Sequence, residues 1–302
     1  MSRPAIRLVE VGPRDGLQNE KHAVPLEAKV ALVDALSKTG VGEIEAGAFV
    51  SPKAVPQMAD SAEVFKRIAR QPGVIYSALV PNEKGLDAAL EAKVDKIAVF
   101  TAASETFNRK NINASIAESI ERFRPVVERA KKQKLPVRAY ISTAFYCPYE
   151  GKVAPAKVLG VVDSLASLGV DEVSIGDTIG RAAPADVRAL LDALLPRVKK
   201  DTVFLHFHDT YGMAVANAIE AWERYGITGF DASAGGLGGC PYAPGAGGNV
   251  GTEDLAFALQ AMGAPVSLDF DALRAAAAAL QTHLGHPLNS RLSRVALRPS
   301  AA

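Results

Sequence analysis

The sequence has almost no net charge and no cluster of one sign that could recruit a charged partner. Its 34 Lys and Arg residues are balanced by 33 Asp and Glu residues, which leaves a formal net charge of +1 over 302 residues. Proteins that bind nucleic acid usually carry a basic excess, and proteins that bind lipid surfaces usually carry a basic cluster. We therefore expect neither a nucleic-acid partner nor a membrane partner.

Cysteine is also scarce. The two cysteines, Cys147 and Cys240, are too few for a framework of disulfide bonds. No apolar run reaches the roughly 18 residues that a transmembrane helix needs, and the first residues show no signal-peptide pattern. We expect two free thiols, a reducing compartment and a cytoplasmic location.

The sequence does contain a regular alternation of short β-branched runs with longer segments of helical period. Each intervening helix would return the chain to the same edge, so the strands should be parallel. This predicts an α/β fold that closes into a (β/α)8 TIM barrel. An open doubly wound sheet is the alternative, but residues 12–16 lack the glycine pattern of its phosphate-binding turn. Eight runs qualify as strands: residues 7–11, 43–48, 74–80, 96–101, 137–143, 172–176, 203–207 and 229–233.

The chain shows no boundary between domains. Hydrophobic residues make up 48% of it, enough for a large core, and an α/β barrel routinely uses about 250 residues for one domain. We expect a single domain over residues 1–302, with the barrel at about 6–262 and a C-terminal helical extension over 263–302.

Reactive groups in such a barrel gather at the C-terminal ends of the strands. Asp15 follows the first predicted strand, Glu45 lies in the second, and Asp177 directly follows the sixth. His206 and His208 belong to the seventh, and their spacing of two directs both side chains to one face. One metal ion could therefore bind both imidazoles.

A His-X-His pair alone is more often two polar residues on a half-exposed strand than a metal site. Asp15 and Asn249 lie in segments that should reach the same rim, where they would add oxygen ligands. A donor set of nitrogen and oxygen suits Mg²⁺ or Mn²⁺ better than a structural Zn²⁺. A contribution from Cys240 would favour zinc instead.

Residues 235–251 hold eight of the 25 glycines and predict a mobile loop. The loop could be a surface linker, but a closing lid would deliver Cys240 to a substrate as a proton donor or acceptor. Cys147, beyond the fifth strand, is expected to be buried and inert.

Two further charged residues have alternative interpretations. Arg14 could form a structural ion pair with Asp15, or Glu45 could hold its guanidinium toward a developing oxyanion. Asp177 could be the N-cap of the following helix or a residue of the site.

Five segments resemble the 3-hydroxy-3-methylglutaryl-CoA lyases, a family of divalent-metal-dependent barrels that make and break carbon–carbon bonds beside acyl-CoA thioesters. The resemblance extends to about Met262. The segments are residues 10–21, 49–53 with 55–58, 111–113, 175–180 and 236–243.

The resemblance implies roles for individual residues. Arg14 would stabilise the enolate of acetyl-CoA, Cys240 would transfer a proton, and Lys21 would lie near the acyl-CoA entrance. The implied metal is Mg²⁺ or Mn²⁺, and the implied assembly is a homodimer. The implied catalytic residues are Arg14, Asp15, Glu45, Asp177, His206 and Cys240; the metal ligands are Asp15, His206, His208 and Asn249; the substrate-binding residues are Arg14, Gln18, Lys21, Ala48 and Thr178.

The implied reaction is a retro-Claisen cleavage of 3-hydroxy-3-methylglutaryl-CoA to acetyl-CoA and acetoacetate. The chain departs from the family at Gly47 and Ala48, where a Thr-Ser pair is common, and at Ala54, where Trp is common. A family cysteine near the C-terminus has no counterpart. The lost hydroxyls and indole predict a pocket that discriminates less between substrates or accepts a larger acyl group. The alternatives are a lyase for another branched 3-hydroxyacyl-CoA, a condensing relative, or a barrel that only binds CoA or metal.

Overall fold

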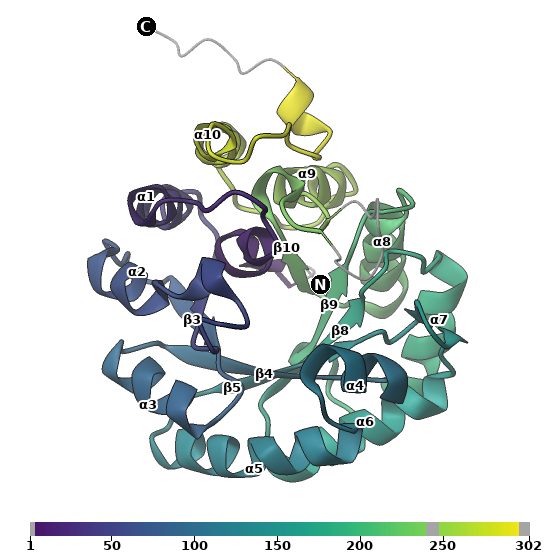
Figure 1. Ribbon diagram of the computed structural model, residues 1–302. Helices are drawn as coiled ribbons and strands as arrows, with labels where there is room; N and C mark the ends of the chain where they lie inside the picture. The colour runs from purple at the N-terminus through teal and green to yellow at the C-terminus, as the bar shows by residue number, and fades with distance from the viewer. Residues whose placement is uncertain (1–3, 240–247, 296–302) are drawn as a thin grey trace, which may run out of the picture.

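The computed structural model describes residues 4–239 and 248–295, and within them eight parallel strands close into a barrel (Figure 1). Around the barrel the strand order is β1-β10-β9-β8-β5-β4-β3-β2. The predicted α/β TIM barrel is therefore confirmed. The strands are β1 (Arg7–Glu10), β2 (Glu43–Ala48), β3 (Ile75–Leu79), β4 (Lys96–Ala102), β5 (Val137–Ser142), β8 (Glu172–Asp177), β9 (Val203–Phe207) and β10 (Gly229–Ala232).

Helices form a ring outside the strands (Figure 1), and α10 (Phe270–Gln281) packs beside α1 after the eighth unit. Two of these helices end where a glycine takes the left-handed conformation that other residues adopt at a cost: Gly169 with φ 87° and Gly226 with φ 70°. No helix in the described ranges is long and apolar enough to cross a membrane. The ring consists of α1 (Leu26–Leu36), α2 (Ser61–Arg67), α3 (Glu83–Glu91), α5 (Ile116–Lys132), α6 (Pro155–Leu168), α7 (Pro184–Leu194), α8 (Ala214–Tyr225) and α9 (Thr252–Ala261).

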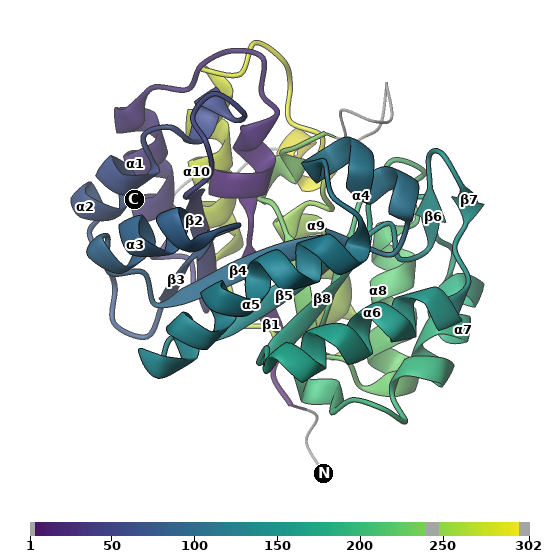
Figure 2. The ribbon, with the colours of Figure 1, turned by 60° about the horizontal axis from the view of Figure 1, so that its bottom comes forward.

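Two insertions that the strand and helix pattern does not predict follow the C-terminal ends of β4 and β5. The first is α4 (Glu105–Ile112), and the second is a hairpin of β6 (Tyr146–Cys147) and β7 (Gly151–Lys152). Figure 2 shows both on the same side of the barrel. They build up the rim on which the candidate site lies.

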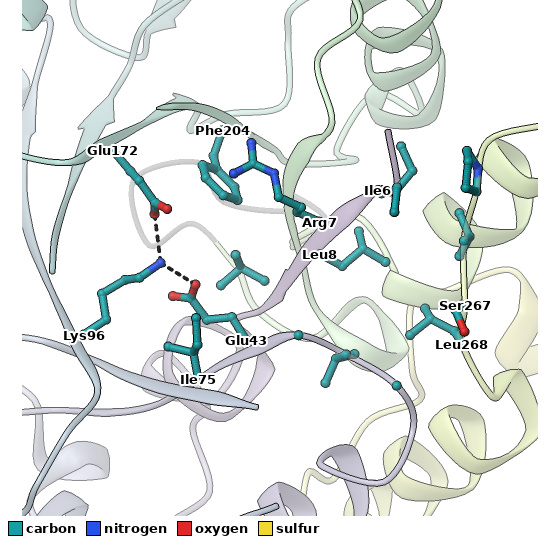
Figure 3. A pocket seen from close by; sticks show the side chains of 17 residues that line it. Ile6, Arg7, Leu8, Glu43, Ile75, Lys96, Glu172, Phe204, Ser267 and Leu268 are labelled. Atoms are coloured by element: carbon teal, nitrogen blue, oxygen red, sulfur yellow. Dashed lines mark hydrogen bonds and ion pairs between the residues drawn. The ribbon is translucent and has the colours of Figure 1, made fainter. Parts of the chain in front are cut away.

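The N-terminal half of the barrel interior is filled by charged side chains. Nζ of Lys96 lies 2.7 Å from Oε2 of Glu43 and 2.9 Å from Oε2 of Glu172 (Figure 3). Arg138, which is 1% exposed, pairs with Glu172 and with Asp231. Mutual pairing of this kind is what makes buried charge tolerable.

A cavity of about 470 Å³ opens below this ionic layer, between the starts of the strands and the segment 265–268. Its wall is mainly apolar, with Ile6, Leu8 and Phe204 among the residues (Figure 3). Catalytic groups of TIM barrels lie at the opposite, C-terminal end, and the N-terminal end serves stability. The candidate site therefore belongs to the other rim.

Candidate metal centre

Asp15, His206 and His208 come together at the C-terminal rim. Each offers one ligand atom, and the three atoms lie within 4.8 Å of one another. His206 belongs to β9, His208 follows it, and Asp15 lies in a π-helical turn, Gly12–Gly16, directly after β1. The ring centroids of the two histidines are 5.2 Å apart, as two side chains on one face require.

Asn249 joins this group through both its backbone and its side chain. Its backbone forms an isolated antiparallel β-bridge with His208. Its side-chain Nδ2 donates to Oδ2 of Asp15 at 2.9 Å and to the carbonyl of Leu237 at 3.0 Å. Within the described ranges, Oδ1 of Asn249 and Nδ1 of His208 are buried without a hydrogen-bond partner. Buried polar atoms normally have partners, so the amide oxygen of Asn249 has a lone pair available for a metal ion.

The chain around Asn249 is anchored at both ends of residues 239–248. Asn19 donates to the carbonyl of Gly239 at 3.2 Å, and the amide of Asp209 donates to the carbonyl of Gly248 at 3.0 Å. A side chain added at Gly248 would collide with the backbone of Gly238. The two ends of this segment therefore meet beside the candidate site. Cys240 lies outside the described residues.

Arg14 is held by both of its predicted partners. Its Nε donates to Oε2 of Glu45 at 2.7 Å, and its Nη1 donates to Oδ1 of Asp15 at 2.6 Å. The guanidinium is only 6% exposed, so these bonds fix its direction. Two carboxylates therefore face one guanidinium at this rim.

Burial and charge act in opposite directions on the ligand atoms. Burial raises the pKa of Asp15, but Arg14 and the two imidazoles outweigh it and hold that pKa well below its usual range. Burial lowers the pKa of His208 to about 4, so its imidazole is neutral at pH 7. An ionised carboxylate and a neutral imidazole are the forms that bind a metal. The residues present therefore fit a divalent cation with oxygen and nitrogen ligands.

The sequence interpretation missed Tyr140, on β5. Its hydroxyl donates to Oε2 of Glu45 at 3.2 Å, and its ring lies edge-on to His206 with centroids 6.2 Å apart. The guanidinium carbon of Arg14 lies 5.4 Å from the ring centroid. Tyr140 lies two residues after Arg138 on β5, so the alternation of side chains along a strand directs both to the barrel interior. This alternation is the sequence signal that could have identified Tyr140.

Asp177 is the last residue of β8, where the loop toward α7 begins. Its carboxylate accepts from the amides of Arg181 at 3.1 Å and Ala182 at 2.9 Å. The N-cap of α7 is Ala183, so the interpretation of Asp177 as that cap was wrong. Burial raises the pKa of Asp177 to about 6. Oγ1 of Thr178 accepts from the amide of Thr143 at 2.7 Å, which ties this loop to the end of β5.

Gly47 does not face the barrel interior, where the sequence analysis expected it to line the substrate pocket. A Cβ placed on it would lie 2.7 Å from Oγ of Ser61 and 3.5 Å from the ring of Phe65, both in α2 outside the barrel. The register of β2 shifts between Glu45 and Gly47, and this irregularity changes which residues point inward. The expectation of a missing hydroxyl in the pocket at Gly47 is therefore wrong.

The remaining predicted residues lie near the rim without a contact that assigns a role. Gln18 is half-buried and Lys21 is exposed, both in the segment after the π-helical turn, while Ala48 is buried at the end of β2. Cys147 is buried as expected, and its Sγ lies 3.0 Å from Oγ of Ser104.

Comparisons with known proteins show which family this chain resembles over almost its whole length. The family model described as HMGL-like matches residues 5–280. A curated protein of Pseudomonas aeruginosa, 3-hydroxy-3-isohexenylglutaryl-CoA/hydroxy-methylglutaryl-CoA lyase, is 50% identical over 292 residues, 97% of each chain. The hydroxymethylglutaryl-CoA lyase of Bacillus subtilis is 47% identical over 95% of each chain. The crystal structure of the HMG-CoA lyase from Brucella melitensis is 50% identical, has a TM-score of 0.91, and matches over 93% of this chain and 99% of that one.

Proposed function

Since this chain belongs to the HMGL-like family, we propose that it cleaves 3-hydroxy-3-methylglutaryl-CoA to acetyl-CoA and acetoacetate with the help of a divalent cation. The observation that carries the proposal is the convergence of Asp15, His206 and His208 within 4.8 Å beside the buried guanidinium of Arg14. Two curated relatives, 50% and 47% identical to this chain, are named as lyases for this substrate.

The proposed ligands are Asp15, His206, His208 and Asn249. A divalent cation bound by these residues would supply Lewis-acid polarisation of substrate oxygens. Side chains of the protein orient the ligand atoms. Asp15 and Asn249 are joined by a 2.9 Å hydrogen bond, which sets the directions of their oxygens. We propose Mg²⁺ or Mn²⁺ because the site offers oxygen and imidazole rather than thiolate ligands.

In the reaction, the 3-hydroxyl loses its proton and the bond between C2 and C3 breaks. The C3 fragment leaves as the ketone of acetoacetate, and the electron pair passes to the thioester as an enolate, which takes up a proton at C2 to give acetyl-CoA. Arg14, held by Glu45, is placed to stabilise the enolate oxygen. Cys240 is our candidate for the proton transfer to C2.

A second substrate class has specific support. The relative from Pseudomonas aeruginosa is named for a 3-isohexenyl substrate as well as the 3-methyl one. This chain lacks a large side chain at Ala48 and Ala54. We propose that a longer 3-alkenyl group is the alternative substituent.

The finer expectations rest on the family. They are an acyl-CoA partner, a homodimer and a cytoplasmic location. Light scattering tests the homodimer, and cell fractionation tests the location.

The deciding experiment measures acetyl-CoA release from the 3-methyl and a 3-isohexenyl thioester, with Mg²⁺ and with EDTA. We expect release that EDTA abolishes and that added Mg²⁺ or Mn²⁺ restores. Full activity after exhaustive chelation would overturn the metal assignment, and no release from either thioester would overturn the proposed reaction.

A further inference from the structure

Asp231, on β10, is a buried carboxylate that the proposed reaction leaves without a task. Its side chain is 0% exposed. The ladder between β10 and β9 pairs it directly with His206, so both side chains reach the barrel interior at the same level. Oδ2 of Asp231 lies 3.4 Å from Nδ1 of His206.

The imidazole of His206 therefore lies between two carboxylates. Its Nδ1 faces Asp231, and its Nε2 lies 3.9 Å from Oδ2 of Asp15 on the side of the candidate metal centre. Among the described residues, Nδ1 has no hydrogen bond of normal geometry. A separation of 3.4 Å is slightly long, and a small rotation of the ring would convert it into a bond.

Asp231 is itself rigidly held. Nη1 of Arg138 donates to its Oδ1 at 2.9 Å, and Oγ of Ser174 donates to its Oδ2 at 2.5 Å. These two hydrogen bonds keep the carboxylate from turning away from His206.

The charge count argues against a purely structural pair. Arg138 and Lys96 are already matched by Glu43 and Glu172, with Arg138 making two hydrogen bonds to Glu172. The carboxylate of Asp231 is therefore one negative charge in excess of the charge on Arg138 and Lys96. Besides Arg138 and Ser174, the imidazole of His206 lies next to this carboxylate.

We propose that Asp231 is the positioning residue of the metal centre, holding the proton of His206 on Nδ1 so that the lone pair of Nε2 faces the metal. Metal-ligating histidines usually donate their second N–H to an acceptor of this kind, which sets both tautomer and ring orientation. The inference rests on the proposed function in one respect, that His206 is a metal ligand.

The first test measures Mn²⁺ affinity from the EPR signal of free Mn²⁺, with no substrate present. Asp231→Asn keeps the shape of the side chain but removes its charge, so we expect Mn²⁺ affinity to fall roughly 10- to 100-fold. The matched control is Glu172→Gln, which removes another partner of Arg138 without touching His206 and should change affinity by less than about threefold. Equal affinities in Asp231→Asn and wild type would overturn the inference.

The second test needs no variant at Asp231 and so survives any failure of Asp231→Asn to fold. Long-range ¹H–¹⁵N spectra of wild-type protein with labelled histidine and bound Mg²⁺ report the tautomer of each of the five histidines. His206 is assigned by the signal lost in His206→Gln. We expect the Nδ1–H tautomer, and an Nε2–H tautomer would overturn the inference.

The two proposals can fail separately. Wild-type protein that binds Mn²⁺ with the expected dependence on Asp231, but releases no acetyl-CoA, would overturn the proposed reaction alone. Wild-type protein that binds no Mn²⁺ would overturn both.

Discussion

Nε of Arg14 donates a 2.7 Å hydrogen bond to Oε2 of Glu45, and this contact joins the turn after β1 to the middle of β2. The same guanidinium also donates to Asp15 at 2.6 Å. Arg14 is thereby oriented by groups on both of its sides before any substrate arrives. Such preorganisation is what makes a donor effective toward charge that develops during a reaction.

Arg14→Lys keeps the positive charge but removes the planar group that can bind Glu45 and Asp15 together. We expect kcat for acetyl-CoA release to fall roughly 10²- to 10³-fold, the usual loss for one oxyanion donor, with little change in Mn²⁺ affinity. Steady-state kinetics check this. The control is Arg124→Lys on the surface, where Arg124 pairs with Glu121. An Arg14→Lys enzyme with normal kcat would show that the guanidinium is not needed.

Cys240→Ser should reduce kcat roughly 10²- to 10⁴-fold, the scale for one acid–base group. Mn²⁺ binding should persist because the proposed ligands are untouched. Cys147→Ser is the matched control, since it removes a buried thiol that contacts Ser104, and it should keep kcat. Equal kcat in the two variants would leave Cys240 no part in proton transfer.

Gly47→Ala should affect stability rather than substrate choice. The new Cβ would lie 2.7 Å from Oγ of Ser61, so we expect a loss of about 1–3 kcal/mol from overpacking. The ratio of rates on the 3-methyl and 3-isohexenyl thioesters should not change. Urea unfolding measures the first effect and paired assays the second.

The control for that experiment is Gly160→Ala in α6, where an added Cβ has no neighbour within 4 Å. It should stabilise the protein by roughly 0.5–1 kcal/mol, because alanine loses less entropy than glycine in a helix. A changed rate ratio in Gly47→Ala would mean that position 47 does reach the substrate.

Glu10 should make stability fall as pH rises. Burial raises its pKa from 4.5 to about 7, although Thr252 and the amides of Ala234 and Gly12 donate to it. The folded protein therefore holds a proton that the unfolded chain releases, and the free energy of unfolding decreases as pH rises between these two values.

In Glu10→Gln this decrease should be smaller, so the variant gains stability relative to wild type as pH rises. Urea unfolding at about pH 5 and about pH 8 measures the slope that Glu10 controls. Parallel slopes in the two proteins would contradict the prediction.

The sequence predicted the barrel and most of the rim because both follow from local patterns. Short β-branched runs separated by helices leave few topologies, and a barrel places the end of each strand on one rim. Asp15 and His206 could thus be assigned to one place although they are far apart in the chain. The distance of 3.9 Å between Nε2 of His206 and Oδ2 of Asp15 confirms that the two residues lie close together.

What the sequence could not predict depends on register between strands. Tyr140 meets Glu45, and Asp231 meets His206, only because particular residues are paired around the barrel. Gly47 was misplaced because the irregularity in β2 reverses the alternation that holds up to Glu45. Alternation read along one strand contains neither kind of information.

Because Gly238 and Gly248 lie against each other, the described chain stops at residue 239 and resumes at residue 248 at one place on the rim. The position of Asn249 is set by its contacts with His208 and Leu237. Closure entropy grows only slowly with loop length, by about 0.6 kcal/mol for each doubling. A segment whose two ends meet in this way can therefore change in length at little cost while Asn249 keeps its position.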